Sequence, residues 1–229
     1  MSLRFANSSG YARINSAATL GNTVNGSILT WYRKEDSTAD REIISLTRPG
    51  GGATIHAYSA TQIRGGLTSN LAGMSFYNVS NGTYIGVALT YADGAISFYA
   101  YDGTNAVLVG TDNSSGSGAN LNIMTFGNTG AWGAAAVGCH RYGRYWSRVL
   151  SLAELTAEFE LVPTVGTPAA STTNLRGSWL FPDSTTNTDL SGLGNTITIA
   201  NGSTSSDEPP IGGGGPPVNH NGVLLLGVG

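Results

Sequence analysis

Acidic residues are the first side chains to consider for catalysis, because glycoside hydrolysis uses two carboxyl groups about 5 to 9 Å apart. Here the acids cluster outside the segments that alternate like strands. They occupy a polar loop, a predicted helix and a Pro-rich stretch: Glu35-Asp36, then Glu154, Glu158 and Glu160, then Asp207-Glu208. The predicted strands contain almost no acid, so the sequence argues against glycoside hydrolysis.

The histidines and the single cysteine suggest no other catalytic set. His56, His140 and His220 lie far apart and lack the spacing of a zinc site. Cys139 and His140 are neighbours on a predicted strand and point to opposite faces, which disfavours a nucleophile–base dyad. Cys139 follows small apolar residues, so we interpret it as a buried hydrophobe. The glycine runs lack the Lys-Ser/Thr of a phosphate loop, and no Gly-x-Ser-x-Gly elbow occurs. We therefore predict that the protein is not an enzyme.

Composition favours one all-β domain. The chain has 229 residues, of which 33 are glycine, and abundant Ser, Thr and Asn indicate many tight turns. Charged residues make up 11%, far below the roughly 25% of an ordinary soluble domain. The hydrophobic fraction of 40% is sufficient for a buried core. The net charge is −3 and the basic residues are scattered, so no stripe for nucleic acid is expected.

The N-terminal residues 1–5 lack a basic region followed by an apolar run, so we expect no signal peptide. No segment reaches the roughly 18 apolar residues of a membrane span. A low-charge surface is typical of proteins outside cells or within large assemblies. Phage virion proteins combine these properties, because they are made in the host cytoplasm and released by lysis. This combination suggests a virion location.

The clearest hairpin joins Tyr84–Tyr91 to Ala95–Tyr101 through Asp93-Gly94, two residues that tolerate positive φ. A third strand is predicted over 106–111. Similar short alternating runs between turn pairs recur along the chain. Some ten or more strands at this spacing predict a two-sheet sandwich.

A strand over Arg144–Val149 leads directly into a helix. Ser151 and Glu154 have the spacing of a capping box, in which each side chain satisfies a backbone N–H at the helix start. Leu155 and Phe159 fall four residues apart and so share one face of the helix that follows.

This passage resembles the end of laminin G-like, concanavalin A-like lectin and glucanase jelly-roll domains, which reads roughly Tyr/Trp-x-Arg-x-Leu-Ser-x-x-Glu-Ile. Residues 175–181 and 189–195 resemble the family's Trp-x-Phe and Asp-x-Ser-Gly-x-Gly-Asn elements, which here follow the helix instead of preceding the domain. The resemblance covers about residues 3–204 and implies an all-β, two-sheet antiparallel jelly-roll sandwich with one short helix and an extended C-terminal tail. The Glu-x-Asp-x-x-Glu pattern of the related glucanases is missing.

The same resemblance raises the question of calcium. Some laminin G-like domains hold this ion at the sandwich rim with aspartates and backbone carbonyls, the oxygen ligands that hard cations prefer. Asp183 and Asp189 are the candidates here, together with Asp112. The alternative is that these aspartates make turns. No other cofactor is expected.

Sugar binding would need aromatic rings on a solvent face with polar neighbours. If the alternating apolar residues of the hairpin face the core, then Tyr84, Tyr99 and Tyr101 face outward. Trp132 lies in a Gly-rich loop and is a second candidate. The alternative is structural, because cross-strand tyrosines stabilise sheets and a second layer can cover them.

The chain divides into a sandwich over 1–204, a Gly/Pro-rich linker over 205–217 and an apolar tail over 218–229. Prolines cannot donate to a ladder, and glycines cost entropy to fix. The tail contains Val223, Leu224, Leu225 and Leu226. Four such side chains left exposed would promote aggregation, so we expect the tail to dock on a partner through a strand edge.

Deletion of residues 212–229 is therefore expected to leave a folded, soluble sandwich that no longer assembles. Light scattering and sedimentation of the truncated protein would measure this. Normal assembly, or a failure to fold, would contradict the prediction.

Three classes of function follow from the sequence. The favoured hypothesis is a non-catalytic virion structural, decoration or fibre protein that assembles with copies of itself or with other virion proteins. The alternative is a carbohydrate-binding module for host or matrix glycans. A glycan-active enzyme is least favoured, because paired carboxylates are missing.

Overall fold

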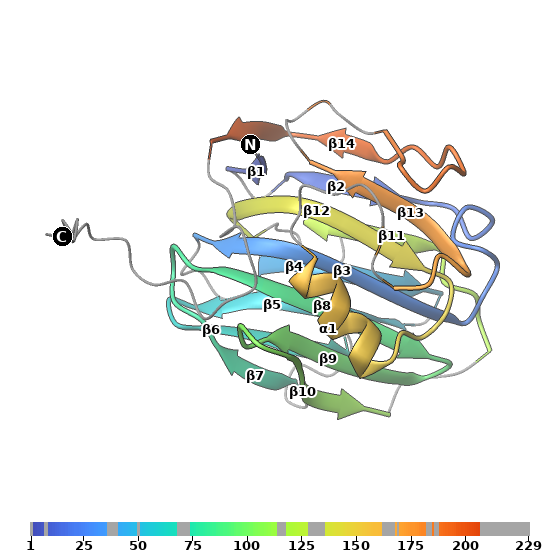
Figure 1. The fold of residues 1–229 in the computed structure, drawn as a ribbon, viewed down its shortest axis with the longest axis horizontal. Coiled ribbons are helices and arrows are strands. Elements are labelled where there is room, and N and C mark those ends of the chain that lie inside the picture. The colour runs from blue at the N-terminus through green and yellow to red at the C-terminus, as the bar shows by residue number, and fades with distance from the viewer. Residues whose placement is uncertain are drawn as a thin grey trace, which may run out of the picture.

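The computed structural model describes residues 2–6, 9–35, 41–49, 51–67, 74–113, 118–127, 136–161, 168, 170–181, 185 and 188–206. Over these residues the chain forms two antiparallel sheets packed face to face, with one helix on the outside (Figure 1). The predicted all-β sandwich with a single short helix is confirmed. The predicted linker from 207 onward and the C-terminal tail lie outside the described residues.

The elements follow in chain order. They are β1 (Ser2–Phe5), β2 (Tyr11–Ile14), β3 (Asn25–Lys34), β4 (Arg41–Arg48), β5 (Gly51–Ser59), β6 (Gln62–Leu67), β7 (Ser75–Asn78), β8 (Tyr84–Ala92), β9 (Ala95–Tyr101), β10 (Ala106–Asp112), β11 (Ile123–Gly127), β12 (Gly138–Trp146), α1 (Leu152–Glu160), β13 (Leu175–Leu180), β14 (Thr198–Ala200) and β15 (Gly202–Ser205).

One sheet of the described chain has eight strands, in the order β10-β9-β8-β3-β12-β1-β15, with β13 also paired to β12. The other has seven, in the order β14-β2-β11-β4-β5-β6-β7. In the eight-stranded sheet the second edge of β12 is shared: residues 138–140 pair with β1, and residues 142–146 pair with β13. The strands that follow the helix therefore complete both sheets: β13 and β15 join the eight-stranded sheet and β14 joins the seven-stranded one.

The predicted hairpin is β8–β9. Asp93 and Gly94 have φ values of +37° and +102°, and Ala92 pairs with Ala95 across the turn. Positive φ at both central residues is the geometry of the two-residue turn that matches strand twist. The strand predicted over 106–111 is β10.

Two apolar clusters hold the fold together. The larger lies between the sheets and includes Ile85, Val87 and Leu89 of β8. The smaller lies on the outer face of the eight-stranded sheet, where α1 packs with its buried Leu155 and Phe159. A Cβ atom on Gly86 would lie 2.5 Å from the Phe159 ring, so the glycine allows this close approach of helix and sheet.

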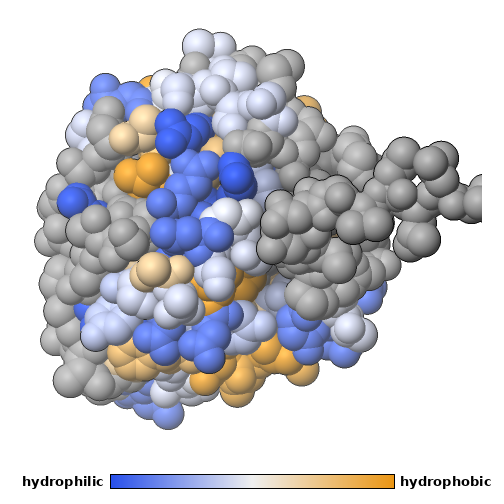
Figure 2. Space-filling view, turned by 90° about the vertical axis from the view of Figure 1, so that its left-hand side faces the viewer, coloured by the Kyte–Doolittle hydropathy of each residue, from blue (hydrophilic) through white to orange (hydrophobic). Residues whose placement is uncertain are grey.

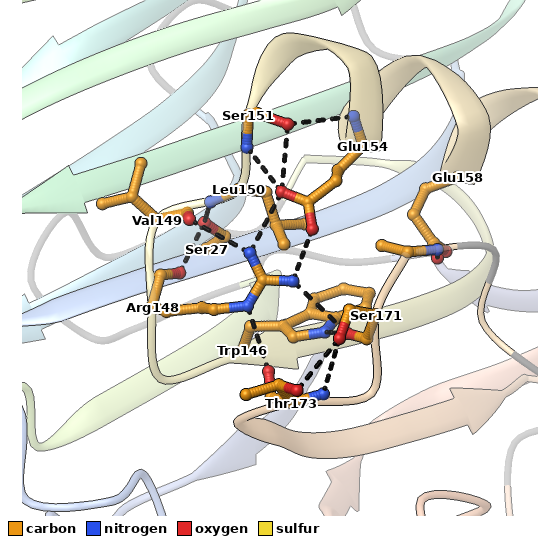
Figure 3. Close-up of polar contacts among 11 residues, drawn as sticks. Ser27, Trp146, Arg148, Val149, Leu150, Ser151, Glu154, Glu158, Ser171 and Thr173 are labelled. Atoms are coloured by element: carbon orange, nitrogen blue, oxygen red, sulfur yellow. Dashed lines mark hydrogen bonds and ion pairs between the residues drawn. The ribbon is translucent and has the colours of Figure 1, made fainter.

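The predicted capping box is present at Ser151 and Glu154. The Arg148 guanidinium donates to both Glu154 oxygens, at 3.0 and 2.6 Å, and also to the backbone carbonyls of Ser171 and Thr173, at 3.3 and 3.0 Å (Figure 3). The pKa of Glu154 is lowered to about 2. The largest cause is its hydrogen bonding with Arg148, and the hydrogen bonds from Ser151 contribute less. Strand β12 ends at Trp146, three residues earlier than predicted, and Arg148 instead takes part in this network.

A second ion pair is buried between α1 and the sheet and connects the two. Arg144 of β12 donates to Glu158 of α1, and their side chains are 2% and 0% exposed. Arg144 Nε also donates to Ser178 Oγ of β13 at 3.2 Å, and Glu158 Oε1 accepts from the Ala170 N–H at 2.6 Å. The pair thus joins the helix, two strands and the segment at Ala170.

Among the described residues, none of the helical segments is both long and apolar enough to cross a bilayer.

Candidate functional site

The tyrosines predicted to face outward do lie on the outer face of the eight-stranded sheet. Two of them are buried in the apolar cluster that α1 joins, however: Tyr84 and Tyr101 are 7% and 8% exposed. The Tyr101 ring packs against Trp31 and Phe159, with centroids 5.8 and 5.6 Å apart. A sugar ring cannot stack on these two faces in this arrangement. Tyr99 is half-buried, and its role in sugar binding stays a prediction.

Asp189 makes a turn. Its Oδ1 atom accepts from the N–H groups of Ser178 and Ser191, at 3.0 and 2.8 Å, and its Oδ2 atom accepts from Ser191 Oγ and the Asn195 N–H, at 2.7 and 2.9 Å. Four hydrogen bonds occupy the carboxylate and favour the turn alternative over a calcium ligand. Within the described ranges, no three His, Cys, Asp or Glu residues are grouped for a metal. Asp183, Trp132 and Val223–Leu226 lie outside these ranges.

The described strands contain two acids, Glu42 in β4 and Asp112 at the end of β10. These strands belong to different sheets, so the two carboxylates do not share a face. The arrangement differs from the pair of carboxyl groups that glycoside hydrolysis uses.

The end of the sandwich at which β3 finishes carries hydrophilic surface across its middle, with apolar surface below it (Figure 2). Glu35, which follows β3, lies between two arginines. It accepts from Arg4 at 2.9 Å and from Arg33 at 3.1 Å. The charges at this cluster are paired with one another.

Aromatic rings are exposed on the outer face of the seven-stranded sheet, at its β7 edge. Phe76 of β7 is 45% exposed, and its ring lies edge-on to Tyr58 of β5, with centroids 5.0 Å apart. Arg64 of β6, the cross-strand partner of Phe76, places its guanidinium 4.8 Å from the Tyr58 ring centroid. Alternation explains the orientation, because Ala57 and Ile63, the neighbours of Tyr58 and Arg64, point into the core between the sheets.

Two amides lie beside these rings. Gln62 of β6 is paired with Asn78 of β7, two residues along each strand from the Arg64–Phe76 pair. Gln62 Nε2 donates to Asn78 Oδ1 at 3.1 Å. We call Tyr58, Gln62, Arg64, Phe76 and Asn78 the aromatic–amide face. It combines an exposed ring for stacking with amide groups that form hydrogen bonds to hydroxyls.

This face was not predicted, although the sequence contains a signal for it. Residues 53–58 alternate Ala-Thr-Ile-His-Ala-Tyr, which puts Tyr58 on the side away from the core. Phe76 is the neighbour of Tyr77, which packs against the core, so the Phe76 side chain points away from the core. Only the strand order brings these two rings together, because β5 and β7 are separated by β6.

No protein-family model matches this sequence, and no curated protein matches it. Solved structures do match. One is described as a candidate carbohydrate-binding protein from Bacteroides ovatus: it is 15% identical, with a TM-score of 0.58 over 92% of this chain and 62% of that one. Another is the Trypanosoma rangeli sialidase in complex with a difluorinated nononic acid: it is 19% identical, with a TM-score of 0.54 over 69% of this chain and 27% of that one.

Both structures share the β-sandwich fold of this chain. At these identities the likeness is one of fold. This chain spans less than two thirds of either matched chain. Neither of these two structures is described as a phage protein.

Proposed function

We propose that this protein is a carbohydrate-binding module and that the aromatic–amide face is its sugar site. The observation that carries the proposal is the exposed Phe76 ring, held edge-on by Tyr58 and flanked by the amides of Gln62 and Asn78. The apolar face of a pyranose ring stacks on an aromatic ring, while its hydroxyls need donors and acceptors at the ring margin.

Arg64 supports this arrangement from within the same face. It is 6% exposed, and its guanidinium lies over Tyr58 rather than in solvent. A cation over an aromatic ring contributes about 0.5 to 2 kcal/mol, the larger figure applying where the cation is desolvated. The contact restrains Tyr58 and, through it, the ring of Phe76, so the surface offered to a sugar is already ordered.

The likeness to the Bacteroides ovatus structure supports the same function. The separation of Glu42 and Asp112 supports binding without hydrolysis. A virion role and assembly through the tail at 218–229 stay predictions, and neither conflicts with sugar binding.

The Phe76→Ala variant is expected to weaken glycan binding at least tenfold, because the stacking surface is removed. Arrayed glycans would identify ligands for the unaltered protein, and calorimetry would then give Kd values for both proteins. Leu193→Ala is the matched control: Leu193 is 54% exposed, but it lies between β13 and β14, and β14 is at the opposite edge of the sheet from β7. The control should bind like the unaltered protein.

Both variants remove exposed surface, so their melting temperatures should stay close to that of the unaltered protein. Glycan binding that survives Phe76→Ala unchanged, or an array without any ligand, would refute the proposed site.

A further inference from the structure

Resting on the proposed function, we propose that the aromatic–amide face selects a neutral hexopyranose through a vicinal diol. Gln62 and Asn78 hydrogen-bond two adjacent hydroxyls, while the apolar face of the same sugar ring lies on Phe76.

The hydrogen-bonding capacity of the amide pair carries the inference. Each side-chain amide has a carbonyl acceptor and an NH₂ group with two donors. The bond from Gln62 Nε2 to Asn78 Oδ1 leaves the Gln62 carbonyl and the Asn78 NH₂ group available to a ligand. If the N and O atoms of both amides are exchanged, Asn78 donates to Gln62 instead. One carbonyl and one NH₂ group are again left available to a ligand. The pair therefore always presents a carbonyl acceptor beside an NH₂ group.

A vicinal diol complements this pair, because each hydroxyl both donates and accepts. One hydroxyl can donate to the free carbonyl, and its neighbour can accept from the free NH₂ group. A deoxy sugar leaves one amide group without its partner. At about 1 to 1.5 kcal/mol for a hydrogen bond, this corresponds to roughly five- to tenfold weaker binding.

Strand geometry places both contacts within reach of one sugar ring. Phe76 and Asn78 lie on the same face of β7, two residues apart, which corresponds to about 7 Å along the strand. The ring and the amides thus contact neighbouring parts of one ligand.

Charge favours a neutral sugar over an acidic one. Arg64 is the charged member of the face, and its guanidinium is buried over Tyr58. Its guanidinium is therefore too buried to form a direct ion pair with the carboxylate of an acidic sugar. The exposed groups are an aromatic ring and two neutral amides.

The test uses Asn78→Asp, which replaces the free donor by a carboxylate oxygen. The probes are the methyl glycosides of galactose, glucose and mannose, their monodeoxy analogues and the 2-amino-2-deoxy glycosides. We expect at least tenfold weaker binding of the parent glycoside that the unaltered protein prefers. We also expect a shift in preference toward the amino sugar, whose ammonium group only donates. Asn201→Asp, in the turn between β14 and β15, adds the same charge away from the face and should change neither.

Two outcomes separate this inference from the proposed function. If Phe76→Ala abolishes binding but deoxy analogues and Asn78→Asp behave like their parents, the diol inference is wrong and the sugar site stands. If Phe76→Ala leaves binding intact, both are wrong. Loss of binding on Phe76→Ala, on removal of either of two adjacent hydroxyls and on Asn78→Asp would support both.

Discussion

The Arg144→Met variant is expected to lower the free energy of unfolding by about 3 to 5 kcal/mol. The Glu158 carboxylate is 0% exposed, and without Arg144 it would keep the Ala170 N–H as its hydrogen-bond donor among the described residues. A buried charge without a counter-charge is costly, because its hydration is not replaced. Urea unfolding followed by tryptophan fluorescence would measure the change.

Two further variants show whether the buried charge is the cause. Adding Glu158→Gln to Arg144→Met removes the charge and keeps an acceptor for the Ala170 N–H, so it should recover part of the loss. Arg148→Met breaks the more exposed pair with Glu154, whose side chains are 22% and 27% exposed, and should cost less. A loss below about 1 kcal/mol for Arg144→Met would show that the pair does not fasten the helix.

The second large effect concerns acid. His140 is completely buried between the sheets, and its ring lies 5.1 to 5.9 Å from those of Phe5, Tyr32 and Phe126. Its Nδ1 atom lies 3.3 Å from Thr30 Oγ1, while Nε2 has no hydrogen-bond partner among the described residues. Burial lowers the pKa of His140 from 6.5 to about 3.

The direction of the pH effect follows from these two pKa values. Above pH 6.5 the imidazole is neutral in both the folded and the unfolded chain, so it costs nothing. Between pH 6.5 and about 3 the unfolded chain binds a proton that the folded chain excludes. The free energy of unfolding should therefore fall by about 1.4 kcal/mol for each unit of acidification in this window.

Comparison with His140→Phe isolates this contribution, since the other titrating groups are common to both proteins. At pH 7.5 the variant and the unaltered protein should have similar free energies of unfolding. Toward pH 4 the variant should become the more stable of the two. Parallel stability curves for the two proteins would exclude His140 as the acid-sensitive group.

The sequence predicted the elements whose signals are local. Asp93-Gly94 defined one hairpin, and Ser151 with Glu154 defined the start of the helix, because both depend on neighbouring residues. The sequence did not predict which surface the helix covers. That depends on the space above Gly86 and on the buried Arg144–Glu158 pair, which join residues far apart in the chain. Tyr84 and Tyr101 were therefore assigned to the correct face, with a covering layer named only as the alternative.

The aromatic–amide face was unpredicted for a related reason. Tyr58 lies where the β5–β6 register shifts, between Ala57 and Ser59, and Phe76 meets it only across β6. Alternation shows which way each side chain points, but it does not show which strands are neighbours. The site arises from strand order.

The shared edge of β12 has a consequence for how the chain folds. Ser2 pairs with Ser205, so the N-terminal strand acquires its outer neighbour only after almost the entire described sequence has been synthesised. Likewise, residues 142–146 of β12 have no partner on their second edge until β13 has been synthesised. Long-range pairings of this kind raise contact order and slow folding. The eight-stranded sheet should therefore close late in folding. Until then the open edges of β1 and β12 are the sites most exposed to mispairing with another chain.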